Sequence, residues 1–216
     1  NLGEKVAIQM NDTHPVLAIP ELMRVLMDDY GYSWKKAWAI TKETMAYTNH
    51  TVMSEALEKW PVNYISNLLP RIMMIIEEID RRVVREVADA NNQNYALAER
   101  VRVIQGGQVH MALLAIHGSH AINGVAKIHT EILKDDLFKD FYQMQPDMFQ
   151  NKTNGITPRR WMLYSNPELK AMLDELIGKD YESDYNHFRD LMKYVDDPEV
   201  QDKFLAIKQT RKEKLA

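Results

Sequence analysis

The stretch Lys5-Val6-Ala7-Ile8-Gln9-Met10-Asn11-Asp12-Thr13-His14-Pro15 decides the expected fold. It joins a short apolar run to a polar turn that begins at Asn11. This order predicts a strand that delivers polar side chains at its carboxyl end, which is where open α/β sheets bind ligands. We therefore expect an α/β fold. The patterns that follow are mostly helical, so we expect it to be helix-rich with few strands.

Helical periodicity dominates the middle of the chain. Its clearest example is an apolar stripe formed by Ile72, Ile75, Ile76, Ile79, Val83 and Val87. Pro70 should kink this helix or start a new one. Residues 110–116 are rich in Ala, Leu and Met, which favours a buried helix over a buried strand. Residues 138–149 predict an aromatic-rich irregular segment.

The sequence pattern changes near residue 154 from long periodic stretches to short capped helices, and this change predicts a domain boundary. The segment 151–161 reads NKTNGITPRRW. Its Asn154-Gly155 pair suits a backbone position with φ above zero. Thr157 and Pro158 predict the N-cap and the first residue of a helix. Short capped helices follow, so we expect one domain over residues 1–154 and a second over residues 155–216.

Composition excludes several classes of protein. The 216 residues suffice for one large domain or parts of two, and the net charge of −4 gives no general attraction to nucleic acid or anionic membranes. No cysteine is present, which excludes disulfides and thiolate zinc sites and fits a reducing cytoplasm. No apolar run approaches the roughly 18 residues of a membrane span. Because the sequence starts without methionine and leads at once into a strand, we expect a piece of a longer polypeptide.

Three polar segments are candidates for chemistry. Asp12 and His14 could bind sugar hydroxyls or act in acid–base catalysis, or could form an Asx-turn with His14 merely packed. The break around His50, with Glu58 nearby, is a ligand wall or an ordinary turn between helices. Around Trp161, arginines and a helix start favour an anion or a phosphorylated ring; the alternative is a charged helix start with a buried tryptophan.

The histidines and glycines give little support to other site types. His110, His117 and His120 have helical spacing, but no Asp or Glu falls between His110 and Ile128 to complete a metal site. We expect no metal and histidines satisfied by backbone groups. The sequence contains no Gly-x-Gly-x-x-Gly pattern, no Walker-type lysine and no Gly-x-Ser-x-Gly elbow, so nucleophile classes lack support.

Several long strings, in order along the whole chain, resemble the α-glucan phosphorylases that act on glycogen, starch and maltodextrin. The strings are VAIQMNDTHP at 6–15, AYTNHT at 46–51, EALEKWP at 55–61, GSHAINGVA at 118–126, IHTEILK at 128–134 and FQNKTNGITPRRW at 149–161. The resemblance implies a piece of about a quarter of an enzyme with two Rossmann-like domains that face a cleft holding pyridoxal phosphate. It also implies cleavage of terminal α-1,4-glucosidic bonds by orthophosphate, giving glucose 1-phosphate with retained configuration.

The resemblance also implies roles for individual residues. His50 resembles the histidine that holds the glucose 6-hydroxyl and turns its main-chain carbonyl toward the developing oxocarbenium. Asn154 resembles the asparagine that shares that hydroxyl. Three further residues resemble members of the same sugar pocket: Asp12, His14 and Glu58. Trp161 resembles the aromatic residue that lines the cofactor site.

Some segments that are essential in that family have no counterpart in this sequence. No segment matches the lysine that forms the Schiff base with pyridoxal phosphate, so we expect the chain alone to hold no cofactor and to be inactive. The two domains would be the end of the glucan-side domain (1–154) and the first helices of the cofactor-side domain (155–216).

The expected partners are α-1,4-glucan and orthophosphate in the cytoplasm, in a parent enzyme that forms homodimers. We expect the piece alone to self-associate through apolar faces that the parent would cover. Two alternatives stay open. One is a sugar-transfer enzyme that uses a nucleotide sugar on the same scaffold; the other is a non-catalytic glucan-binding or assembly module.

Overall fold

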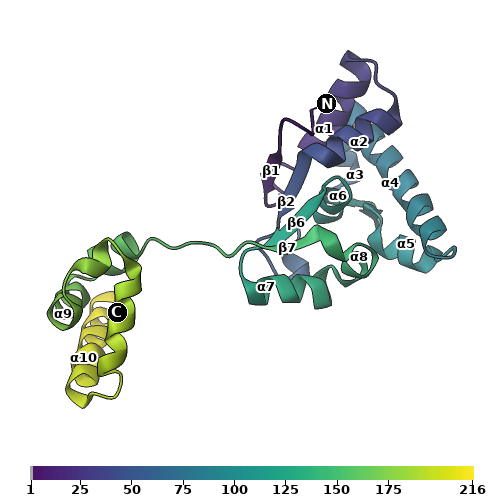
Figure 1. Cartoon of the computed structure of the whole chain (residues 1–216). Helices are drawn as coiled ribbons and strands as arrows, with labels where there is room; N and C mark the ends of the chain where they lie inside the picture. Colours follow the sequence, from purple (N-terminus) through teal and green to yellow (C-terminus); the bar gives the residue numbers. More distant parts are fainter. Residues whose placement is uncertain (1) are drawn as a thin grey trace. The chain divides into compact units, whose positions relative to one another are not determined.

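The computed structural model describes residues 2–216, and they form two compact units that divide between Asn154 and Gly155 (Figure 1). The first unit is an α/β arrangement rich in helix. Its strands are β1 (Ile8–Asn11), β2 (Met45–Thr48), β3 (Lys59–Pro61), β4 (Ile104–Gln105), β5 (Gln108–His110), β6 (Ala121–Gly124) and β7 (Phe149–Asn151). Its α-helices are α1 (Ala18–Arg24), α2 (Trp34–Thr44), α3 (Val62–Leu68), α4 (Pro70–Ala90), α5 (Tyr95–Val101), α6 (Met111–His117), α7 (Lys127–Ile132) and α8 (Lys139–Met144).

Shorter helical turns complete the first unit. Two are π-helical, η1 (Val25–Asp29) and η3 (Leu133–Leu137), and two are 3₁₀, η2 (Ser54–Ala56) and η4 (Pro146–Met148). Each π-helical turn directly continues an α-helix, α1 or α7. The expected irregular segment over residues 138–149 is therefore wrong, since α8, η4 and β7 occupy it.

Four strands form a parallel sheet in the order β1-β2-β6-β7, and helices connect them (Figure 1). Because all four run the same way, their carboxyl ends meet at one edge of the sheet. The expected strand at the start of the chain is confirmed as β1. A break between helices was expected around His50, next to β2, and no strand was expected at β6, so only one strand of this sheet was predicted.

The two faces of the sheet differ sharply. One rung pairs Met10 with Tyr47, Tyr47 with Ile122 and Ile122 with Phe149, and all four side chains are buried. Successive side chains on a strand point to opposite faces. The next rung therefore places the polar residues Asn11, Thr48, Asn123 and Gln150 on the other face.

Helix α4 supplies much of the core beside the sheet. The predicted stripe is confirmed, because Ile72, Ile75, Ile76, Ile79 and Val83 are buried. Pro70 stands in the first turn, where its missing N–H has no partner to lose, so it starts the helix as expected. The predicted buried helix after His110 is also confirmed as α6.

The first unit also contains an antiparallel sheet of three strands in the order β3-β5-β4. Its β4–β5 hairpin turns at Gly106 and Gly107, whose φ angles are 55° and 74°. Such a two-residue loop needs positive φ at both positions, which glycine adopts without strain. The buried carboxylate of Asp80 anchors this hairpin by accepting from Arg102 Nη2 at 2.6 Å and from the Ile104 N–H at 2.9 Å.

The second unit is a small helical assembly. It contains η5 (Arg159–Tyr164), α9 (Pro167–Ile177), η6 (Asp180–Glu182), η7 (Tyr185–Tyr194) and α10 (Pro198–Leu215). Asn166 caps α9, and Gly178 ends it with a φ of 73°. Leu163, Leu173 and Tyr181 form its core.

One expectation at the start of this second unit is wrong, because Gly155 and Asn154 are not among the described residues with positive φ. Another is confirmed in part. Pro158 is the first helical residue, and the Thr157 carbonyl accepts from the N–H groups of Arg160 and Trp161, but the Thr157 side chain makes no capping bond.

Candidate functional site at the carboxyl edge of the parallel sheet

The polar face of the sheet ends in a hollow of about 400 Å³. Every strand of the sheet, or the residues directly after it, contributes to the lining. The lining residues are Gln9, Asn11, Thr48, His50, Ala121, Asn123, Val125, Gln150, Lys152 and Asn154. They alternate along the sequence because only every second residue of a strand points to this face. The hollow thus lies where the topology of a parallel sheet favours ligand binding.

Hydrogen bonds between neighbouring strands orient the side chains that form the floor of the hollow. Gln9 Nε2 donates to Thr48 Oγ1 at 2.7 Å, and Thr48 Oγ1 donates to Asn123 Oδ1 at 2.8 Å. The Asn123 amide in turn donates to the Gly124 carbonyl at 3.0 Å. A hydroxyl and amides held in this way offer fixed donors and acceptors to a polar ligand.

His50 and Asn154 stand on the same hollow, although 104 positions separate them in sequence. His50 is exposed, and its Nε2 lies 2.5 Å from Asn11 Oδ1. Because a carboxamide oxygen only accepts, Nε2 carries the proton and donates it. The Asn154 backbone N–H donates to the Val125 carbonyl at 2.8 Å, and this bond holds the last residue of the first unit next to the end of β6.

A buried network supports the loop that carries His50. The Asn49 side chain is fully buried; its Nδ2 donates to the Tyr47 hydroxyl at 3.0 Å, and its Oδ1 accepts from the Thr51 N–H at 2.9 Å. His129 Nε2 lies 3.0 Å from the same Oδ1. Burial raises the pKa of Tyr47, so its phenol stays a neutral hydroxyl. The network fixes the residues on both sides of His50.

His14 and Glu58 line a different hollow, of about 280 Å³, together with Trp60 and apolar side chains of α3 and its surroundings. Glu58 accepts from Thr13 Oγ1 at 2.5 Å and from Trp60 Nε1 at 2.7 Å. Both of its carboxylate oxygens are thus engaged, and it ties the turn after β1 to the start of β3. The structure therefore does not bring these two residues to the hollow that His50 and Asn154 line.

Asp12 follows Asn11, which lines the first hollow, and precedes His14, which lines the second. Its φ of 66° is unusual for a residue with a side chain, and its N–H donates to the Thr48 carbonyl at 2.9 Å. Its Oδ1 accepts from the Thr13 N–H at 2.6 Å. Strained backbone of this kind is enriched at ligand sites, and here it turns the chain sharply from Asn11 toward Glu58.

Trp161 belongs to the second unit, whose placement relative to the first is not defined. Its side chain is 70% exposed and makes no ring contact with any residue that the structure describes. It is therefore not the buried tryptophan of the alternative interpretation. Across residues 2–216 no three His, Cys, Asp or Glu side chains gather as metal ligands.

Of the ten residues that line the main hollow, only His50 and Asn154 were expected from the sequence, and six of the eight others are polar. They are Gln9, Asn11, Thr48, Asn123, Gln150 and Lys152. The signal that could have found three of them is a polar residue directly after a large apolar or aromatic one, in the pairs Met10-Asn11, Tyr47-Thr48 and Ile122-Asn123. Each pair is so short that the same letters also fit a turn between helices.

Comparison with known proteins shows which family this chain resembles in sequence. The sequence model of the carbohydrate phosphorylases matches residues 1–216. The chain is 51% identical to the muscle form of glycogen phosphorylase from Ovis aries, 52% to that from Oryctolagus cuniculus and 49% to the brain form from Rattus norvegicus. Each alignment covers 99% of this chain and 26% of the relative. The chain therefore spans about a quarter of the length of these relatives. Within residues 2–216, no helix has the length and apolar character needed to cross a membrane.

Proposed function

Because this chain belongs to the carbohydrate phosphorylase family, we propose that it forms one wall of the sugar-binding cleft of an α-glucan phosphorylase. The whole enzyme would cleave terminal α-1,4-glucosidic bonds with orthophosphate and release glucose 1-phosphate. One observation carries the proposal: His50 and Asn154 line one hollow at the carboxyl ends of four parallel strands.

The chemistry of the hollow supports a sugar ligand. Its lining offers amides, a hydroxyl and an imidazole, which can exchange hydrogen bonds with sugar hydroxyls in both directions. No acidic side chain is among its ten described lining residues, and Lys152 adds a positive charge. This balance suits a neutral sugar close to an anion such as orthophosphate. Within this proposal His50 and Asn154 hold the reacting glucose, while Asp12, His14 and Glu58 shape the adjoining turn.

The two units would belong to two domains of the complete enzyme. We infer that residues up to 154 complete a Rossmann-like glucan-side domain, since sequential parallel strands with helical connections suit that fold. Residues 155–216 would begin the cofactor-side domain. A cytoplasmic location and a homodimeric parent remain predictions.

The residues described here do not enclose pyridoxal phosphate, the cofactor that the family resemblance implies. Trp161 is exposed, and its neighbour Tyr164 is 85% exposed. An exposed aromatic pair gives no closed site for a phosphorylated ring. We therefore assign Trp161 only a lining role beside the cofactor and derive no step of the reaction through that group.

The first test compares this chain with the complete polypeptide. Each is incubated with maltoheptaose, orthophosphate and pyridoxal phosphate, and glucose 1-phosphate is measured. We expect product from the complete polypeptide and none from the chain alone. Product from the isolated chain would contradict the proposal that the opposite wall of the cleft is required.

The second test changes the residue with the clearest role. In the complete polypeptide, His50→Ala should lower kcat/KM by about 100-fold, the size expected when one positioned polar group is lost from an active site. His120→Ala is the matched control, since this exposed histidine lies outside the hollow. Equal effects of the two substitutions would contradict the role of His50.

The alternative of a non-catalytic glucan-binding module predicts a different result. In that case the isolated chain would bind maltoheptaose without cofactor, and NMR signals of His50 and Asn154 would shift in a saturable way. If the complete polypeptide also released no glucose 1-phosphate, this alternative would replace the enzyme proposal.

A further inference from the structure

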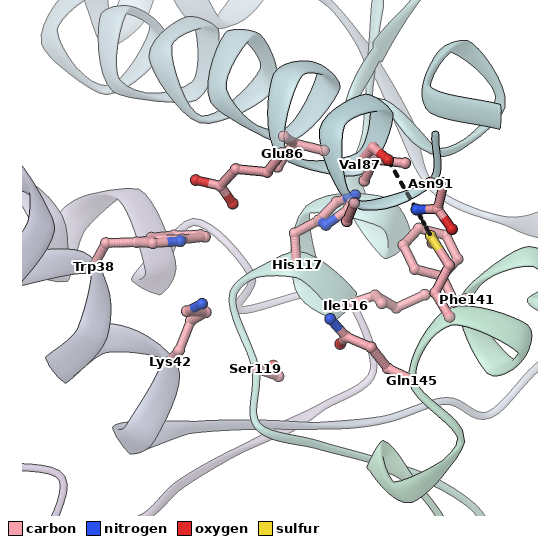
Figure 2. A pocket seen from close by; sticks show the side chains of 13 residues that line it. Trp38, Lys42, Glu86, Val87, Asn91, Ile116, His117, Ser119, Phe141 and Gln145 are labelled. Carbon is pink, nitrogen blue, oxygen red and sulfur yellow. Dashed lines mark hydrogen bonds between the residues drawn. The ribbon is translucent and has the colours of Figure 1, made fainter. Parts of the chain in front are cut away.

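A second cavity, of about 330 Å³, lies between helices α2, α4, α6 and α8 of the first unit (Figure 2). It shares no lining residue with the hollow at the carboxyl edge of the sheet. Three of its residues belong to patterns described above, Val83 and Val87 in the apolar stripe and His117 among the histidines, and the proposed function uses none of its lining residues. Its volume falls in the range of small-molecule sites.

One side of the cavity is apolar. Val83 of α4 lines it. Val87 of α4, Ile116 of α6 and Phe141 of α8 line it as well (Figure 2). Val83, Ile116 and Phe141 are buried, so they form a continuous surface with the core. This surface can take up an aliphatic or aromatic group of a ligand, gaining roughly 25 cal/mol per Å² of apolar area removed from water.

The other side of the cavity carries two opposite charges. Lys42 comes from α2 and Glu86 from α4, and Figure 2 shows both side chains lining the same opening, with the Trp38 ring beside them. Neither forms an ion pair with any residue that the structure describes; the Lys42 Nζ lies 5.7 Å from the centre of the Trp38 ring. Each charge is therefore available to a ligand group of opposite sign.

His117 adds an acceptor at the inner end. Its Nε2 lies 2.8 Å from the Val101 carbonyl, which only accepts, so Nε2 carries the proton. Burial lowers the pKa of His117 to about 4, so the ring is neutral and Nδ1 keeps a free lone pair at neutral pH. No described residue donates to this Nδ1. The ring is held in place by an edge contact with Phe141 at 5.0 Å between centroids.

Ser119 adds a polar group to the wall of the cavity. Its side chain is only 3% exposed, yet its Oγ has no hydrogen-bond partner among the described residues. Ser119 and Gln145 both line the cavity (Figure 2). The unpaired Ser119 hydroxyl makes this part of the cavity wall polar, although its oxygen has no surface open to the cavity.

From these groups we propose that the cavity binds a compact zwitterion with an apolar side chain, the chemistry of a free α-amino acid. Its ammonium donates to Glu86 and to Nδ1 of His117, and its carboxylate accepts from Lys42. Its side chain packs on the apolar surface. A neutral sugar would leave both charges of the cavity unpaired, and a nucleotide would place several negative charges next to Glu86.

The test titrates L-leucine into the chain and follows the Trp38 indole N–H and the His117 ring signals by NMR. We expect saturable shifts of both signals below about 20 mM, in the affinity range of a small metabolite site. N-acetyl-L-leucine removes the ammonium charge and L-leucinamide removes the carboxylate. Each analogue should bind at least about 10-fold more weakly, as expected when one charge-assisted contact is lost.

Variants provide a second measurement. Glu86→Gln should lower the affinity for L-leucine by about 10-fold, to a value similar to the affinity for N-acetyl-L-leucine. Lys42→Met should also lower the affinity for L-leucine by about 10-fold, to a value similar to the affinity for L-leucinamide. The matched controls are Glu77→Gln on α4 and Lys35→Met on α2, exposed residues that do not line the cavity; both should bind as the unaltered chain does.

Three results would overturn the proposal. They are no saturable shift at Trp38 and His117, equal binding of L-leucine and its two analogues, or equal effects of the cavity variants and their controls. If a cavity variant fails to fold, the analogue series on the unaltered chain still decides, since it needs no substitution. Shifts caused by maltoheptaose but not by L-leucine would assign the cavity to sugars and would also contradict the proposal.

Discussion

The Nε2 atom of His129 lies 3.0 Å from Oδ1 of Asn49, although 80 positions separate the two residues. The backbone N–H of Val125 donates to His129 Nδ1 at 3.0 Å, so Nδ1 must be the unprotonated nitrogen and Nε2 must donate. The bond therefore has a fixed direction. It links the helix after β6 to the loop after β2, and these two segments border the hollow that His50 and Asn154 line.

Breaking this bond should destabilise the chain. We expect His129→Phe to lower the free energy of unfolding by about 2–3 kcal/mol, because the buried Asn49 oxygen and the Val125 N–H each lose a partner. Urea denaturation followed by circular dichroism measures the change. His120→Phe, at an exposed histidine, should stay within about 0.5 kcal/mol. Similar losses for both variants would show that the Asn49–His129 bond has no special weight.

His117 should make stability depend on pH. Its ordinary pKa of 6.5 is lowered to about 4 in the folded chain, chiefly by burial. Between these values the unfolded chain binds a proton that the folded chain does not, so the free energy of unfolding falls as pH drops from 6.5 to 4. The loss is at most on the order of 3 kcal/mol and is smaller if solvent reaches the ring. Below pH 4 both states bind the proton, and this contribution stops changing.

His117→Gln isolates that contribution. The glutamine amide can still donate to the Val101 carbonyl but does not titrate. The difference in unfolding free energy between the original chain and the variant should be constant above pH 7 and should shrink between pH 6.5 and 4. Every other titrating group cancels in this difference. A difference that stays constant down to pH 4 would contradict a lowered pKa for His117.

Removing the buried carboxylate of Asp80 should lower the free energy of unfolding more than removing the exposed carboxylate of Glu99, which contacts the same arginine. Asp80→Ala leaves Arg102 and the Ile104 N–H without their buried acceptor, and we expect a loss of about 3–5 kcal/mol. Glu99→Gln alters the exposed side of the same arginine, where Nη1 lies 3.0 Å from the carboxylate, and should cost less than about 1 kcal/mol. Thermal unfolding of both variants checks this ratio, and comparable losses would contradict it.

Replacement by alanine should destabilise the chain at Gly107 but not at Gly155. Gly107 has a φ of 74°, so Gly107→Ala should destabilise the β4–β5 hairpin by about 1–2 kcal/mol even though no atom lies near the added Cβ. Gly155 is not a positive-φ position, and its added Cβ also meets nothing within 4 Å. Gly155→Ala should be neutral or stabilise by up to about 0.5 kcal/mol. Denaturant titration of the two variants separates backbone strain from crowding.

Features that depend on neighbours in sequence could be predicted well. Ser33, Asn166 and Asp197 accept capping bonds at the helix starts where polar residues precede an apolar pattern. Pro70 begins α4, and Gly178 ends α9. In each case the partners lie within four residues, so the sequence contains the whole interaction.

The parallel sheet could be predicted only in part. The run at β1 was recognised because apolar residues precede an obvious polar turn. The four-residue strands β2 and β6 were not predicted, since their stability comes from pairing with strands 27 or more positions away rather than from their own composition. The resemblance to a family predicts His50 and Asn154 as site residues, but it contains no information on their shared hollow.

The sequence alone therefore determined the helix ends, the apolar stripe of α4 and membership of the family, because these depend on local spacing or on strings of letters. Tertiary structure decided which polar residues meet. Parallel pairing places Asn11, Thr48 and Asn123 on one rung, and the packing of α2, α4, α6 and α8 leaves Lys42, Glu86 and His117 around one cavity. The reason is physical: such contacts depend on register and packing between segments that are distant in the chain, and neither leaves a periodic signal in the sequence.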